Sequence, residues 1–116
     1  MSSFTRNAKG HLCAAGMPLS RIVASHGSPL YVYSGNGILD DYRHFAAAVA
    51  PVDGSVHFAL KANSALGVIG LLAQHGAGAD IVSGGEMARA LAAGIPAEKI
   101  VFSGVRQVGR GDRRGA

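Results

Sequence analysis

The fold is decided by residues 76–103, which read GAGADIVSGGEMARALAAGIPAEKIVFS. Two short apolar runs, at 79–82 and 100–103, stand on either side of a segment with helical spacing at 86–93. Short apolar runs of this kind are typical of strands that are buried on both faces. The stretch therefore predicts a strand, a helix and a second strand that runs parallel to the first.

The same pattern occurs once more upstream. Residues 56–60 (VHFAL) form a third apolar run, and helical spacing follows between Ser64, a candidate N-cap, and Gly76, a candidate terminator. Strands that recur every ~20–25 residues with helices between them indicate consecutive parallel units. Right-handed crossovers place both helices on one face of the sheet. We therefore predict an α/β fold with about three parallel strands and their helices.

The first fifty residues have a different pattern of apolar residues. Residues 29–34 (PLYVYS) combine a leading proline with aromatic and β-branched residues, which predicts a separate strand. Apolar residues at helical spacing from Ile38 to Ala50 predict a helix that Pro51 ends.

Three polar residues lie near the ends of the predicted parallel strands, where such folds collect their chemistry. Lys61 follows the first strand, and burial there would favour the neutral amine that attacks an aldehyde. Asp80 begins the second strand and can orient or protonate a neighbouring lysine. Ser83 opens a Ser-Gly-Gly-Glu turn, whose N–H groups can face an anion. Each residue also has a structural interpretation, which spacing alone favours: a lysine that reaches water, a turn aspartate and an ordinary β-to-α loop.

Composition excludes several classes of protein. The 116 residues are 48% hydrophobic and 16% charged, which fits one small globular domain. The single cysteine, Cys13, cannot form an internal disulfide, and the five histidines are scattered, so we predict no metal site. No signal-like start or membrane-length apolar run is present, which predicts a cytoplasmic protein without a membrane partner.

The net charge of +4 is concentrated at the end of the chain. Residues 106–116 hold four arginines against one aspartate and read as a disordered Arg/Gly tail. The nearly neutral remainder argues against nucleic-acid binding. A small nucleic-acid-binding module that uses this tail stays open as an alternative of another class, and removal of the tail would abolish such binding.

Five blocks in order carry a family resemblance: PLYVYS (29–34), FALKAN (58–63), GAGADIVSGGE (76–86), RALAAGIP (89–96) and KIVFSGV (99–105). Together they resemble the N-terminal part of diaminopimelate decarboxylases, within the fold type III pyridoxal-phosphate (PLP) enzymes. The resemblance implies the N-terminal portion of a PLP-binding TIM barrel. It also implies three regions: 1–36 as the N-terminal segment of a second β-domain, 37–105 as partial barrel and 106–116 as tail.

By this resemblance, Lys61 matches the lysine that forms the internal aldimine with PLP. Asp80 matches an acidic residue near that lysine, and Ser83 and Glu86 fall in the loop that faces the cofactor. The implied reaction is decarboxylation of meso-diaminopimelate to L-lysine, with PLP as electron sink. Intact members of the family are usually homodimers.

The family's phosphate loop, ring-stacking histidine, acidic partner of the pyridine nitrogen and cysteine proton donor have no counterpart in the sequence. After Val105 the chain departs abruptly from the family pattern. We therefore expect a truncated reading frame whose product is marginally stable and inactive by itself. A fragment of a related ornithine or arginine decarboxylase, or of a racemase-like protein, remains an alternative.

Overall fold

The structure is a computed structural model that describes residues 3–104. The chain divides into two compact units, with the boundary between Val56 and His57. Within the described residues, no helix is both long enough and apolar enough to cross a membrane. The Arg/Gly tail lies outside the described range.

The second unit contains a three-stranded parallel sheet. Its strands are β4 (His57–Ala59), β5 (Gly78–Ile81) and β6 (Ile100–Phe102), in the spatial order β4-β5-β6. The register pairs Ala59 with Asp80 and Asp80 with Val101 across the two ladders. These strands coincide with the three apolar runs of the sequence, so the predicted parallel sheet is confirmed.

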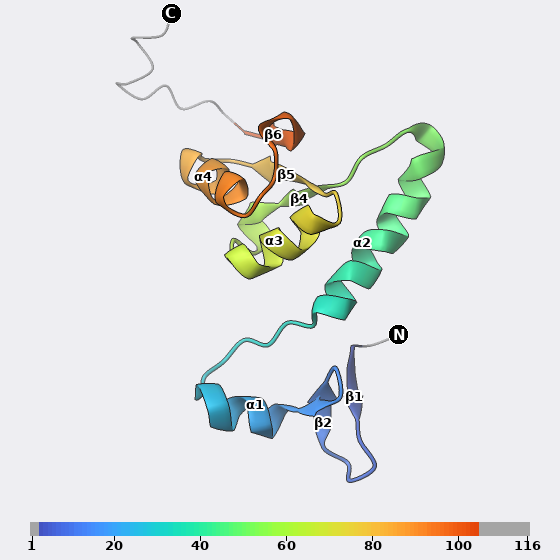
Figure 1. The fold of residues 1–116 in the computed structure, drawn as a ribbon, viewed down its shortest axis with the longest axis vertical. Coiled ribbons are helices and arrows are strands. Elements are labelled where there is room, and N and C mark those ends of the chain that lie inside the picture. The colour runs from blue at the N-terminus through green and yellow to red at the C-terminus, as the bar shows by residue number, and fades with distance from the viewer. Residues whose placement is uncertain (1–2, 105–116) are drawn as a thin grey trace, which may run out of the picture. The chain divides into compact units, whose positions relative to one another are not determined.

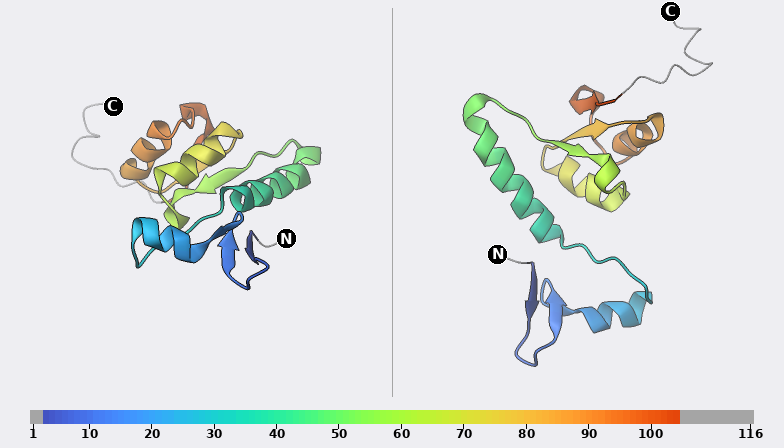
Figure 2. Two further views of the ribbon diagram at one scale, coloured as in Figure 1. Left: turned by 60° about the horizontal axis from the view of Figure 1, so that its bottom comes forward. Right: turned by 180° about the vertical axis from the view of Figure 1, so that it is seen from behind.

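Two helices cover one face of this sheet (Figures 1 and 2). They are α3 (Leu66–Gln74) and α4 (Gly84–Ala92), each followed by a glycine with positive φ. Ile69 of α3 and Ala90 of α4 are fully buried with alternate residues of β5, which places both helices on one side as predicted. The core of the unit consists of Leu60, Ile69, Ala79, Ile81, Ala90 and Ile95, with Phe58, Ala73, Ala93 and Ile100 packed around it.

The two helices begin differently. Ser83 is the N-cap of α4, and its hydroxyl accepts a hydrogen bond from the Glu86 amide at 3.1 Å. The expectation that Ser64 caps α3 is wrong. Ala65 takes the N-cap position without a side-chain bond, and the Asn63 side chain accepts the Ala65 amide at 3.0 Å instead. A short side-chain amide satisfies its neighbour's backbone as effectively as a serine does.

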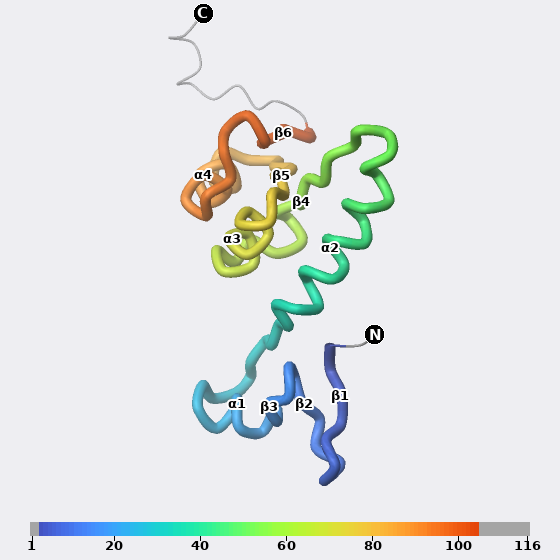
Figure 3. The backbone as a smooth tube through the Cα atoms, turned by 45° about the vertical axis from the view of Figure 1, so that its right-hand side comes forward, coloured from blue at the N-terminus to red at the C-terminus, as the bar shows by residue number. Residues whose placement is uncertain are grey.

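The first unit begins with antiparallel strands that the sequence analysis did not predict (Figure 3). The Asn7 side chain accepts the amides of Lys9 and His11, and Gly10 takes a positive φ, so this segment forms the tight turn of the first hairpin. The elements are β1 (Phe4–Arg6), β2 (Leu12–Ala14) and β3 (Met17–Pro18), in the order β1-β2-β3, and then helix α1 (Leu19–His26).

The strand predicted at residues 29–34 is wrong as a paired strand. Within the described residues this segment belongs to no sheet, although Ser34 at its end has an extended backbone. Leu30, Tyr31 and Tyr33 are exposed, and Tyr31 reaches 88% exposure. Aromatic and β-branched residues favour a strand only where a neighbouring strand offers hydrogen bonds and side-chain packing. Here no such neighbour is described.

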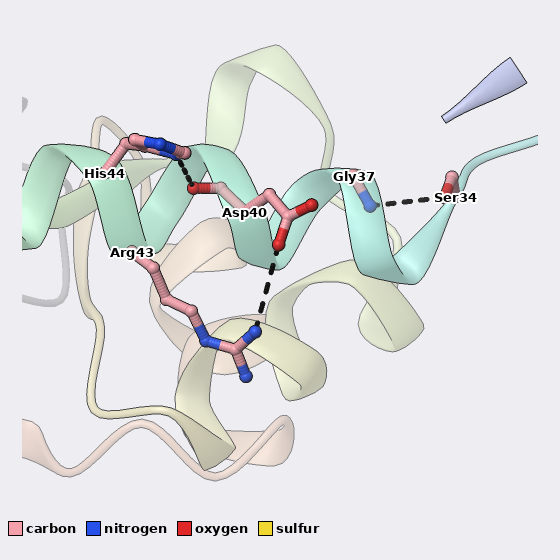
Figure 4. A network of polar contacts seen from close by, with 5 residues as sticks. All are labelled: Ser34, Gly37, Asp40, Arg43 and His44. Carbon is pink, nitrogen blue, oxygen red and sulfur yellow. Dashed lines mark hydrogen bonds and ion pairs between the residues drawn. The ribbon is translucent and has the colours of Figure 1, made fainter. Parts of the chain in front are cut away.

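Helix α2 (Gly35–Val49) confirms the helix predicted from Ile38 to Ala50, with an earlier start. Ser34 is its N-cap, and the serine hydroxyl accepts the Gly37 amide at 3.2 Å (Figure 4). The helix therefore begins at Gly35, three residues before the predicted start at Ile38. A 3₁₀ turn, η1 (Ala50–Val52), holds Pro51 and follows α2 directly.

Candidate functional site

Lys61 lies just beyond the carboxyl end of β4, in the 3₁₀ turn η2 (Leu60–Ala62). Its side chain is exposed, and within the described residues its amine makes no hydrogen bond or ion pair. The sequence left two interpretations of this lysine, a buried amine and a side chain that reaches water. The second, which spacing alone favoured, is confirmed, because the chain leaves the sheet at Leu60. Leu60 takes the buried position, with 1% exposure. The lysine amine is thus available at the edge of the sheet.

Asp80 is the third residue of β5, where the sequence analysis placed it at the start. Its neighbours Ala79 and Ile81 point into the core, so alternation along the strand directs Asp80 to the opposite face. The aspartate is half-buried, and its Oδ1 is buried without a hydrogen-bond partner. A buried oxygen in this state costs about 1–3 kcal/mol, so a donor at this place would be strongly favoured.

The register of the sheet places Lys61 and Asp80 on or next to adjacent strands. Ala59 pairs with Asp80 across adjacent parallel strands, and Lys61 follows Ala59 by two residues. Lys61 therefore lies beyond the carboxyl end of one strand while Asp80 belongs to its direct neighbour. The structure thus brings an available amine and a carboxylate without a donor to neighbouring strands of one sheet.

Ser83 and Glu86 form a reciprocal cap around the start of α4. The Ser83 hydroxyl accepts the Glu86 amide, and Glu86 Oε1 accepts the Val82 amide at 2.9 Å. The turn is therefore a variant of the capping box, which confirms that it has a structural role. Ser83 is nevertheless exposed at the carboxyl edge, and a side chain at Gly84 would meet no atom within 4 Å. The space beside Gly84, at the start of α4, is therefore open.

A close approach at Gly78 of β5, on the face of the sheet opposite α3 and α4, was not predicted from the sequence. A Cβ at Gly78 would lie 2.5 Å from His57 Cδ2 and 2.5 Å from the Lys99 carbonyl oxygen. The His57 ring and the Lys99 backbone therefore occupy the space of a side chain on β5. Only glycine fits between them without a shift of its neighbours.

The loop after Lys61 is held by three hydrogen bonds. The Asn63 amide donates to the Leu60 carbonyl at 3.1 Å, and the Asn63 side chain accepts the Ala65 amide. Arg89 Nη1 of α4 donates to the Ser64 carbonyl at 3.1 Å. The arginine and serine are 25 residues apart, so no local sequence signal indicates this contact.

A second group of polar side chains lies on α2 (Figure 4). Asp40 and Arg43 form an ion pair at 3.9 Å with both side chains more than half exposed, and the Asp40 carbonyl contacts His44 Nδ1 at 2.8 Å. A shallow hollow there is lined by residues of this one helix. Exposed pairs of this kind contribute little energy. In addition, residues 3–104 hold no cluster of three or more potential metal ligands. The sheet edge is therefore the candidate site.

Comparison with known proteins assigns the chain, including this edge of the sheet, to a family. Residues 36–110, more than half of the chain, match the family model for the pyridoxal-binding domain of pyridoxal-dependent decarboxylases. The chain belongs to the pyridoxal-dependent decarboxylases. Lys61, Asp80 and Ser83 all lie inside the matched region of this family.

Several members of this family that resemble the chain are diaminopimelate decarboxylases. A diaminopimelate decarboxylase from Pseudomonas fluorescens is 53% identical over 105 residues, which are 90% of this chain and 25% of the relative. A diaminopimelate decarboxylase structure from M. jannaschii, in complex with L-lysine, matches with a TM-score of 0.80 at 33% identity and covers 87% of this chain and 24% of that one. The Helicobacter pylori enzyme with L-lysine gives 0.71 at 40% identity over 76% of this chain and 22% of its own.

These matches confirm the predicted resemblance and the partial barrel. The chain spans about a quarter of the length of the curated relatives that it matches. Its parallel sheet with two helices corresponds to the N-terminal part of the pyridoxal-binding domain in pyridoxal-dependent decarboxylases.

Proposed function

We propose that this chain supplies the cofactor lysine and the first strands of a diaminopimelate decarboxylase, which converts meso-diaminopimelate to L-lysine. The single observation that carries the proposal is the exposed Lys61 amine at the carboxyl edge of β4, inside the region that matches the pyridoxal-binding family. The names of the relatives support the substrate, and the two structural neighbours described above are complexes with L-lysine.

The described residues fit pyridoxal phosphate in two respects. Lys61 offers an amine without a competing partner, and Asp80 offers a buried carboxylate oxygen that has no donor. Lys61 would hold the cofactor through its side-chain amine, at the carboxyl edge of β4. When bound, the cofactor accepts the electron pair that remains on the substrate as carbon dioxide leaves.

Asp80 and Ser83 take supporting roles in this proposal. Asp80 would accept a proton or a hydrogen bond at Oδ1, on the strand next to the one that carries Lys61. The Ser83 oxygen already accepts the Glu86 amide, so its hydroxyl hydrogen remains to donate to the cofactor. The amides at the start of α4 favour an anionic group on the same side.

The domain assignment and the partners belong to the same proposal. Residues 1–36 would form part of the β-domain, residues 37–105 part of the barrel and residues 106–116 a tail; the family match, which begins at residue 36, supports the first boundary. The substrate would be an amino acid, the intact enzyme a homodimer and its compartment the cytoplasm. The tail that the nucleic-acid alternative requires lies outside the described residues, so no observation favours that alternative.

The test is site-specific reaction with pyridoxal phosphate. We expect the purified chain to gain a visible absorbance band, and borohydride to fix the cofactor on Lys61 by delivering hydride to the C=N bond. Peptide mapping then compares Lys61 with the other lysines of the chain, Lys9 and Lys99. The Lys99 amine bonds the Gly76 carbonyl at 3.4 Å, so Lys99→Ala is a matched control that removes an exposed lysine of the same unit.

We expect Lys61→Ala to lose the band and Lys99→Ala to keep it. Equal labelling of Lys9, Lys61 and Lys99 would show reaction with any exposed amine and would refute the assignment of Lys61. A band that persists in Lys61→Ala would refute it as well.

A further inference from the structure

The turn that carries Lys61 is anchored on its first side by the core. Leu60 is 1% exposed and packs in the cluster that contains Ala90 of α4 and Ile81 of β5. Both β5 and α4 lie against the turn. Lys61 follows this anchor directly, so its backbone is fixed on the N-terminal side.

On the second side the turn is anchored by one arginine. Arg89 Nη1 donates to the Ser64 carbonyl at 3.1 Å and thereby joins α4 to the loop between η2 and α3. The start of α4 is in turn fixed by the reciprocal Ser83 and Glu86 cap. Lys61 thus lies between a buried leucine and a backbone carbonyl that α4 holds in place.

We propose that Arg89 is a positioning residue for Lys61, acting through the Ser64 carbonyl; this inference rests on the proposed function of Lys61. The guanidinium donates to the loop and has no role in the chemistry itself. Because the contact is exposed, its effect is modest and local. Its loss lets residues 61–65 open more often, while Leu60 keeps the sheet and the helices packed.

The experiment uses two readouts on the full chain and its variants. Arg89→Met keeps the aliphatic stem and removes the donor, and Arg89→Lys keeps a cationic donor. Lys99→Met is the matched control, because it removes another bond from a side chain to a carbonyl in the same unit. Amide hydrogen exchange reports loop opening, and the initial rate of pyridoxal phosphate fixation reports the availability of Lys61.

In Arg89→Met we expect exchange at the Asn63 and Ala65 amides to rise about two- to tenfold, with α4 and β5 unchanged. Fixation at Lys61 should slow by a smaller factor than this, because it depends on the population of the closed turn, while Lys9 and Lys99 react as before. Arg89→Lys should fall between the wild type and Arg89→Met, and Lys99→Met should leave both readouts unchanged.

Three results would overturn the proposal. The first two concern Arg89→Met: unchanged amide exchange at Asn63 and Ala65, or an equal rise of exchange across β5 and α4. The third is an exchange rate in Arg89→Lys that is as high as in Arg89→Met. The proposed function fails separately. A wild-type chain that fixes no cofactor at Lys61 would refute that function, and the exchange pattern would still decide whether Arg89 holds the turn.

Discussion

The two compact units of the chain bury their apolar residues to very different degrees. In the second unit, β5 with α3 and α4 on one face builds a continuous core in which Ile69 and Ala79 are fully buried. In the first unit, large apolar side chains such as Tyr31 and Phe45 are mostly exposed. Each parallel β-α-β unit packs its crossover helix onto its own strands, whereas an extended segment must find a partner elsewhere. Local connectivity therefore decides which unit is internally packed.

The strongest test of this difference compares two apolar truncations. Leu60→Ala removes a fully buried side chain, and we expect the free energy of unfolding to fall by about 2–5 kcal/mol. Phe45→Ala removes a large side chain that is 58% exposed, and we expect a change within about 0.5 kcal/mol. Urea unfolding followed by circular dichroism measures both. Equal losses would show that the first unit has a core of comparable strength.

A smaller effect is expected from two glycines of the second unit. Gly78→Ala places a methyl group 2.5 Å from the His57 ring and the Lys99 carbonyl, which should cost about 1–3 kcal/mol. Gly84→Ala meets no atom within 4 Å and should stabilise the start of α4 by about 0.4–1 kcal/mol. Thermal unfolding of the two variants separates the two roles of glycine. Gly78→Ala reports the close packing on β5, and Gly84→Ala reports the lower conformational freedom of the unfolded chain. If Gly78→Ala is tolerated as well as Gly84→Ala, the close approach on β5 is wrong.

The third test compares the serine caps of the two units. Ser83→Ala and Ser34→Ala each remove a hydroxyl that accepts an amide of the first helical turn, and each should cost about 1 kcal/mol. The losses should appear at different places in a hydrogen-exchange map, at α4 for Ser83 and at α2 for Ser34. A loss that spreads from one cap to both helices would mean that the two units unfold together.

The parallel sheet and its helices could be predicted from the sequence because their signals are local. Apolar runs mark β4, β5 and β6, and helical spacing marks α3 and α4. The strands β1 to β3 are as short as β4 and β6, but they were missed because no alternation of strands with helices marks them. The segment at 29–34 has the composition of a strand, but composition does not supply a neighbouring strand.

The features of the candidate site also divide into those with a local sequence signal and those that depend on how the chain packs. Lys61, Asp80 and Ser83 could be proposed as site residues because strand ends can be located from the sequence, and the capping role of Ser83 follows from its spacing to Glu86. The sequence left the burial of Lys61 open between two interpretations, because its exposure depends on where the chain leaves the sheet. The bond from Arg89 to Ser64 was missed because it joins positions that become neighbours only after α4 packs beside the turn.

The buried Oδ1 of Asp80 has a consequence for engineering this chain. An oxygen without a donor lowers the stability of the unliganded protein, so replacement of Asp80 by an apolar residue should make the isolated chain more robust. A library sorted only for expression or heat resistance would then discard this carboxylate early. Variants enriched in that way would be easier to purify and poorer at the chemistry proposed for the sheet edge, since activity and robustness place opposite demands on one side chain.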